Sequence, residues 1–198
     1  PMNIKDYFIS DMVLDDRFSD LDGFNGTPND EELYLLLSTY DGDLEEGIVK
    51  LIDLRNFQVL HKWNPDIDAF NGLVEQVDDF KYLMRDNHQK RSLLMHPKLT
   101  SDGGLLFGWE APLRKINFCS DLIFQNTHDR FHHSIEFDTD GNIWAPSRLY
   151  PQALPVSTVG RKTTDDRGFS DDAIVKLSSG GKVIFEKSVS QILIDNRL

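Results

Sequence analysis

One pattern recurs three times along the chain and constrains the fold more than any other feature. Each copy is an apolar strand that ends in Lys-Leu or Lys-Ile, a turn of about four residues, and a second apolar strand. The copies span residues 47–63, 112–126 and 173–187, and their anchoring lysines are Lys50, Lys115 and Lys176. Apolar alternation around a polar turn is typical of a β-hairpin, so the sequence predicts three related hairpins.

A second pattern precedes the later two hairpins. His96 leads through a short strand to an Asp-Gly pair at 102–103 and an apolar strand. His132 leads in the same way to an Asp-Gly pair at 140–141 and another apolar strand. Asp-Gly between two alternating strands is a strong hairpin signal. Joining the two patterns gives four strands per unit, which is the organisation of a β-propeller blade.

The predicted fold class is therefore all-β, a β-propeller of four-stranded antiparallel blades. Residues 33–198 would hold about three blades, as three sheets of up to four strands, after an irregular lead-in at 1–32. We expect a buried strand at 33–37, a short helix within 69–83 and a loop at 152–172. A self-contained β-sandwich is the alternative, because strand patterns alone do not close a ring.

Three blades cannot close, since propellers need about four to eight. The expectation is a single partial domain spanning 1–198 that belongs to a longer protein or assembles with a partner. Its open blade faces would then favour self-association. The start at Pro1-Met2 leads us to expect a missing N-terminal segment, which could have carried a signal or an anchor.

Composition excludes several classes of protein. The net charge is −12, which disfavours binding to nucleic acid and means that an anionic substrate would need local cations. No apolar run is long enough to span a membrane. The one cysteine, Cys119, cannot form a disulfide within the chain.

The candidate site residues are His96, His132 and Arg148. In a propeller the first strand of each blade lines the central channel, so repeat-equivalent histidines would converge there. His132 and His133 are adjacent, so only one of them should face the channel if both lie in a strand. Arg148 ends the strand after the second Asp-Gly turn and would return beside His132, where its guanidinium could bind a tetrahedral anion. In the alternative interpretation, the histidines simply suit the polar beginning of a strand, and Arg148 forms an ion pair with an acid at the surface.

Other chemistry lacks support in the sequence. Glu136, Asp138 and Asp140 resemble the start of a calcium loop, but Ser147 stands where the bidentate acid is expected. No His/Cys cluster has zinc spacing, no phosphate-binding glycine loop precedes a helix, and no nucleophile elbow is present. Asn25 begins a formal glycosylation sequon that an ordinary turn explains equally well. We therefore predict neither a metal nor a cofactor.

Several segments together resemble the arylsulfotransferase family. They are residues 49–54 and 61–63 of the first hairpin, His96 with Asp102-Gly103, residues 131–135 with 140–143, and Ser147-Arg148. The similarity runs from Leu33 onward.

The resemblance implies a six-bladed propeller that moves a sulfuryl group from a phenolic sulfate ester to another phenol. In that family a channel histidine is the nucleophile and becomes sulfated, while other histidines and an arginine bind the sulfate. Here His96, His132 and Arg148 match the supporting catalytic site, and His133 is assigned to substrate binding. The family's nucleophilic histidine has no match before Leu198. The resemblance also points to a periplasmic or extracellular location.

Two other functions remain open at this point. One is a non-catalytic propeller that binds a ligand or a protein, with the histidines and the arginine serving structure or recognition. The other is a hydrolase or lyase on the same scaffold, because a fold does not determine a function.

Overall fold

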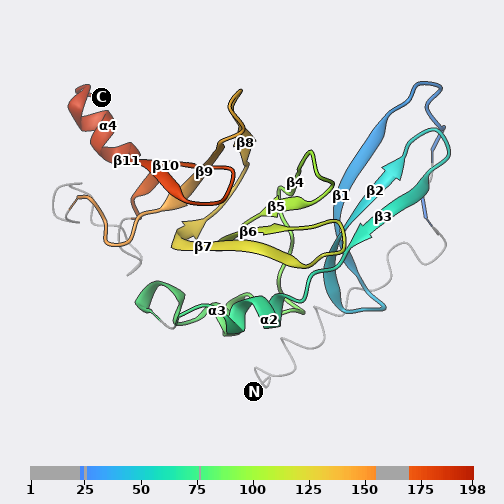
Figure 1. The fold of residues 1–198 in the computed structure, drawn as a ribbon, viewed down its shortest axis with the longest axis horizontal. Coiled ribbons are helices and arrows are strands. Elements are labelled where there is room, and N and C mark those ends of the chain that lie inside the picture. Colours follow the sequence, from blue (N-terminus) through green and yellow to red (C-terminus); the bar gives the residue numbers. More distant parts are fainter. Residues whose placement is uncertain (1–22, 25, 76, 155–169) are drawn as a thin grey trace, which may run out of the picture.

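The computed structural model describes residues 23–24, 26–75, 77–154 and 170–198 (Figure 1). All strand pairs of the described residues are antiparallel. The strands form three meanders that follow one another along the long axis of the molecule (Figure 1). Most of the predicted lead-in, the sequon residue Asn25 and the centre of the loop predicted at 152–172 lie outside the described residues.

The first meander has three strands, β1 (Tyr34–Asp41), β2 (Glu46–Asp53) and β3 (Gln58–Trp63). The β2–β3 pair is the first predicted hairpin. The buried strand expected at 33–37 is instead half-buried in β1, and Leu33 before it is exposed. The expectation of burial was wrong because β1 is an edge strand of this sheet, so its apolar residues are only partly covered.

The other two meanders have four strands each, as the two joined sequence patterns predict. The middle meander contains β4 (Lys98–Leu99), β5 (Leu105–Phe107), β6 (Ala111–Ile116) and β7 (Leu122–Phe131). The C-terminal meander contains β8 (Glu136–Phe137), β9 (Ile143–Arg148), β10 (Asp172–Leu177) and β11 (Val183–Ser188). Gly103 and Gly141 adopt φ of 80° and 77° in the two Asp-Gly turns, a conformation that favours glycine.

The prediction of three separate sheets was wrong, because the described strands form two. The end of β7 pairs with the end of β9, through Arg130 opposite Arg148 and Phe131 opposite Ser147. This contact joins the middle and C-terminal meanders into one eight-stranded sheet. Neither sheet closes on itself within the described residues.

The middle meander is buried on both faces. In β5, Leu105 and Phe107 pack into a cluster with Val49 and Trp63 of the first meander. Leu106, whose side chain points to the opposite face, packs with residues of the C-terminal meander. Three consecutive residues are therefore buried, which places a hydrophobic core on each side of this sheet.

Short helices lie below the middle meander in the view of Figure 1. They are α2 (Ile67–Gly72), η1 (Asp78–Phe80) and α3 (Leu83–Asp86), so the helix predicted within 69–83 is confirmed only in part. Buried Arg114 of β6 donates to Asn71 of α2 at 2.6 Å, which ties the helix to the sheet. The C-terminal helix α4 (Val189–Asp195) was not predicted; Ser188 caps its start by accepting from the Gln191 amide. No helix of the described residues has the length and apolar character needed to cross a membrane.

Candidate functional site

Three histidines and a tryptophan gather where the middle and C-terminal meanders meet. The ring of His133 lies 6.2 Å from that of His96, 5.6 Å from that of Trp109 and 4.8 Å from that of His132. His96 and Trp109 are 6.2 Å apart. His132 is buried, whereas His96 and His133 are exposed. The structure thus brings together all three histidines that the sequence singled out.

Their arrangement differs from the predicted one in two respects. His96 lies two residues before β4, whereas His132 lies four residues before β8, so they are not at matching positions of the two meanders. His132 and His133 lie between strands, and His133 has a φ of 58°. This left-handed turn brings the two rings edge to face. Because neither residue lies in a strand, the alternation on which the expectation of one channel-facing histidine depends does not apply to them.

Arg148 lies in a network of alternating charges. Its Nη2 is 2.8 Å from Oε1 of Glu110, and Nη1 of Arg130 is 3.7 Å from Oε2 of the same carboxylate. Nε of Arg130 donates to Oδ1 of Asp79 at 2.7 Å. Burial raises the pKa of Asp79, whose side chain is almost fully enclosed. In the strand register Arg148 lies opposite Arg130, while the His132 amide donates to the carbonyl of Pro146, two residues before Arg148. That Arg148 and His132 share one site stays a prediction.

Buried polar atoms without a hydrogen-bond partner concentrate in this region. The described residues contain four such side-chain atoms, and three are His132 Nε2, Arg148 Nε and Asp79 Oδ2. His132 Nε2 lies 3.4 Å from Oδ1 of Asp172 without making a hydrogen bond. Unsatisfied polar groups in a native interior often mark a ligand site, because an unmet donor or acceptor is costly. Two of these atoms belong to predicted site residues. Arg148 Nε is a donor, and His132 Nε2 is one in the tautomer that carries a proton there, so a bound anion could then satisfy both.

Backbone strain is also present here, at three of the seven described non-glycine residues that have a positive φ. His96, Glu110 and His133 have φ of 49°, 50° and 58°, which non-glycine residues rarely adopt. Such conformations cost about 1–3 kcal/mol each and cluster at functional sites. The strained positions surround Trp109, so the loop that joins β5 to β6 is held in an unusual shape beside the histidines.

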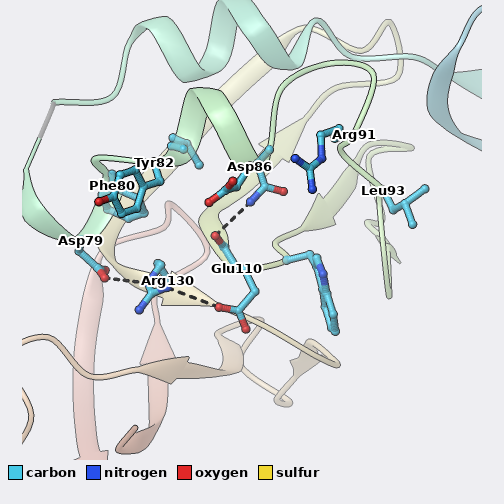
Figure 2. A pocket seen from close by; sticks show the side chains of 11 residues that line it. Asp79, Phe80, Tyr82, Asp86, Arg91, Leu93, Glu110 and Arg130 are labelled. Atoms are coloured by element: carbon cyan, nitrogen blue, oxygen red, sulfur yellow. Dashed lines mark hydrogen bonds and ion pairs between the residues drawn. The ribbon is translucent and has the colours of Figure 1, made fainter. Parts of the chain in front are cut away.

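A cavity of about 410 Å³ opens beside this network (Figure 2). Trp109 and Glu110 line it from the β5–β6 loop, Arg130 from β7, and Asp79 and Tyr82 from the helical segment. Its volume is in the range of small-molecule sites, which span about 300–1,000 Å³. Because Trp109 also touches His133, one loop connects the cavity to the histidine cluster.

Sequence reasoning missed Trp109, Glu110, Arg130 and Asp79. The segment Gly108-Trp109-Glu110 offered a local signal, since it places a large aromatic residue beside an acid between two predicted strands. Arg130 and Asp79 carried no local signal. They contact each other at the site although they are 51 residues apart in the chain.

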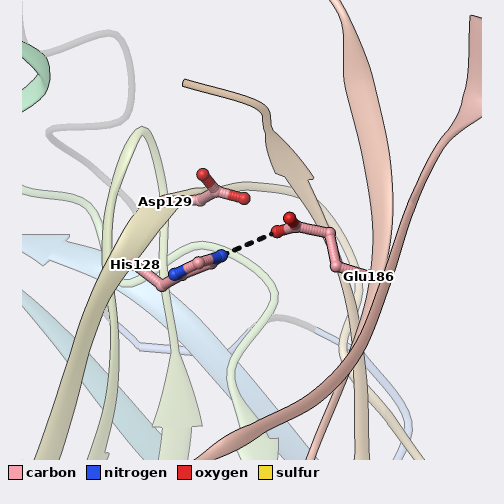
Figure 3. A group of neighbouring side chains, drawn as sticks. All are labelled: His128, Asp129 and Glu186. Carbon is pink, nitrogen blue, oxygen red and sulfur yellow. Dashed lines mark hydrogen bonds and ion pairs between the residues drawn. The ribbon is translucent and has the colours of Figure 1, made fainter. Parts of the chain in front are cut away.

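A second group of side chains, from β7 and β11, offers potential metal ligands (Figure 3). The ligand atoms of His128, Asp129 and Glu186 all lie within 4.8 Å of one another. His128 Nε2 is 3.0 Å from Oε1 of Glu186, and Ser147 donates to Oδ2 of buried Asp129 at 2.6 Å. Burial, and contact with the Glu186 carboxylate, raise the pKa of Asp129 to about 6.

The repeated lysines have a structural role in these two meanders. Lys115 contacts Asp102 at 2.6 Å, and Lys176 contacts Asp138 at 2.8 Å. Each lysine therefore holds an acid of the Asp-Gly turn in its own meander. The hydrogen bond from Lys176 lowers the pKa of Asp138. Asp138 belongs to the loop that resembles a calcium site, and Lys176 already pairs with its carboxylate.

The sequence model of the arylsulfotransferase (ASST) family matches residues 96–198. This range includes His96, His132, His133 and Arg148, and it spans both four-stranded meanders. The chain belongs to the arylsulfotransferase family. The first hairpin, which also resembled the family, lies outside the matched residues. No curated protein and no solved structure matches this arylsulfotransferase-family chain.

Proposed function

We propose that this chain is part of an aryl sulfotransferase that moves a sulfuryl group from a phenolic sulfate ester to a phenol. The meanders would be about three blades of a propeller, within a single partial domain that spans 1–198. Face-to-face burial of the middle meander between its neighbours supports this reading, because propeller blades pack in that way.

In the proposed reaction a histidine nitrogen from outside this chain attacks sulfur. The S–O bond to the donor phenol breaks, and the donor leaves as a phenolate that takes up a proton. The sulfohistidine then passes the sulfuryl group to the oxygen of the acceptor phenol, which loses its proton, and free histidine is regenerated. A covalent intermediate divides the transfer into two steps. No cofactor enters this balance.

The observation that carries the proposal is a pair of buried side-chain nitrogens without a hydrogen-bond partner, His132 Nε2 and Arg148 Nε, in a chain of this family. A sulfate group bound near them would accept from Arg148 Nε, and from His132 Nε2 in the tautomer that carries a proton on that nitrogen. Charge on the sulfuryl oxygens and the leaving phenolate is best stabilised by donors that are already positioned. His96 would serve as a further proton-transfer or binding group, and His133 with Trp109 would contact the substrate.

The test is aryl sulfate turnover by the protein with all of its blades, followed as release of the donor phenol. Arg148→Ala and His132→Ala should each lower kcat/KM by about 10²- to 10³-fold, typical of losing a positioned donor. Arg148→Lys should recover only part of that loss, because lysine lacks the planar fork. Unchanged turnover in both alanine variants would show that these residues are scaffold.

One observation favours a non-catalytic binding module as the second candidate. Arg148 is ion-paired with Glu110 and its side chain is 38 % exposed, as expected of a structural surface pair. The two functions differ in one measurable property. A binding module would bind an aryl sulfate without transferring its sulfuryl group, even when the ring of blades is complete.

A further inference from the structure

Two arginines on neighbouring strands share a single carboxylate. Arg130 of β7 and Arg148 of β9 are directly opposite in the strand register, and both side chains face Glu110. Their separation along the sequence is 18 residues, but the β7–β9 contact places them side by side. Figure 2 shows Glu110 reaching toward Arg130 at the cavity. Paired guanidinium groups are a common way to bind the oxygens of a sulfate or phosphate group.

Glu110 satisfies this pair incompletely. It meets Arg148 Nη2 at 2.8 Å, but its other oxygen stays 3.7 Å from Arg130 Nη1, beyond hydrogen-bond distance. Arg148 Nε is buried and has no hydrogen-bond partner. A sulfate group offers three terminal oxygens where a carboxylate offers two, and it can therefore reach donors that Glu110 leaves unmet.

The charges around the pair favour exchange of one anion for another. Arg130 and Arg148 face Asp79 and Glu110, so the group of four is neutral with Glu110 in place. Without the Glu110 carboxylate it carries one positive charge, which the single negative charge of a sulfate monoester would neutralise. In a chain of net charge −12, such a local cation is what an anionic substrate needs.

Glu110 is placed where it can move. It occupies the short loop between β5 and β6 with a strained φ of 50°, and its side chain is 28 % exposed. The amide of Asn87 donates to its backbone carbonyl, so the side chain can rotate while the loop stays anchored. Both Glu110 and Arg130 line the 410 Å³ cavity, which leaves room for the carboxylate to turn and for a ligand to enter.

We propose that Arg130 and Arg148 form the binding site for the sulfate group of an aryl sulfate, and that Glu110 occupies this site until the ester displaces it. The proposal rests on the proposed function for its ligand and adds two residues to it. Arg130 is a second sulfate-binding residue, and Glu110 is an internal competitor that keeps the arginines paired in the free protein. Trp109, next to Glu110, would then lie against the aryl ring between the cavity and the histidines.

The experiment is titration calorimetry of this chain with inorganic sulfate and, separately, with phenyl sulfate, at constant ionic strength set with chloride. Glu110→Gln removes the competing charge and should tighten sulfate binding by about fivefold or more. Glu136→Gln is the matched control, because it makes the same change in net charge at an exposed ion pair with Lys98. It should change the affinity by less than about twofold.

Arg130 provides the second arm of the test. Adding Arg130→Gln to Glu110→Gln should return the affinity to the wild-type value or below it. Phenyl sulfate should follow the same order as inorganic sulfate; if only inorganic sulfate does, the site binds free anions and the ester proposal is wrong. Glu110→Asp, whose shorter side chain keeps the charge but withdraws it from Arg148, should give an intermediate affinity, and it replaces the glutamine variant should that variant not fold.

The inference is overturned if Glu110→Gln binds sulfate no more tightly than the wild type, or if Arg130→Gln has no effect in that background. Either result would make the network a structural ion-pair cluster. These binding measurements need no turnover, so they stand apart from the test of the proposed function. Sulfate binding that follows the predicted order, in a protein whose turnover survives His132→Ala, would keep the anion site and reject the catalytic role of His132.

Discussion

Replacing Asp129 with asparagine tests the electrostatics at the junction of the two larger meanders. Asp129 of β7 is 1 % exposed, accepts a hydrogen bond from Ser147 of β9, and faces the Glu186 carboxylate of β11. Burial and this second acid raise its pKa from 3.8 to about 6. Asparagine has nearly the same shape, still accepts from Ser147, and carries no charge to desolvate.

The size of the effect follows from linkage. Because the folded protein binds the Asp129 proton more tightly than the unfolded chain does, ionisation of Asp129 destabilises the fold. This loss of folding free energy is absent below pH 3.8, the pKa of Asp129 in the unfolded chain. It grows as the pH rises and is complete above about pH 7. A shift of about two pKa units corresponds to at most about 3 kcal/mol. We expect Asp129→Asn to match the wild type near pH 4 and to exceed it by about 1–3 kcal/mol near pH 8.

Urea unfolding of both proteins across this pH range, followed by circular dichroism, measures the difference directly. Asp102→Asn is the control of opposite sign, because the hydrogen bond from Lys115 lowers the pKa of Asp102 to about 2. Its side chain is half-exposed, so that variant should lose less than about 1 kcal/mol at neutral pH. A difference between wild type and Asp129→Asn that stays constant with pH would refute the reasoning. The unfolding measurements would then be repeated with a chelator. If the stability difference became pH-dependent, a cation bound by His128, Asp129 and Glu186 would have been compensating the Asp129 charge.

Two further predictions concern packing and association. Gly181→Ala should lower the free energy of unfolding by about 2 kcal/mol or more, because φ there is 81° and a Cβ atom would lie 2.5 Å from the Phe124 ring. Gly180→Ala, whose Cβ would meet nothing closer than 3.9 Å, should stay within about 0.5 kcal/mol of the wild type in the same unfolding assay. The chain alone should self-associate through exposed apolar residues such as Ile123 and Ile184, which are 55 % and 52 % exposed. Light scattering that reports a monomer at high concentration would contradict this last expectation.

The hairpins could be predicted from sequence because their signals are local. Apolar alternation around Lys50, Lys115 and Lys176 sets which residues face the core, and glycine in an Asp-Gly turn permits the left-handed backbone that the turn requires. The same signals predicted His96, His132 and Arg148 at the ends of strands; Arg148 does end β9, whereas His96 and His132 lie outside the strands. Helix α4 escaped prediction because its seven residues include no buried side chain and so show no pattern of burial to read.

The site itself depends on contacts that no local pattern encodes. The histidine rings meet because His133 takes a left-handed conformation, which a non-glycine residue adopts only when its surroundings compensate for the strain. Arg130 and Arg148 face one carboxylate because two residue pairs join β7 to β9, and that join follows from burying the middle meander on both faces. Apolar alternation determined which side of each strand is buried. Only the tertiary structure decided which strands pack against each other, because those contacts join segments far apart in the chain. The hydrophobic effect favours burial of apolar surface whatever the position of its partner in the sequence.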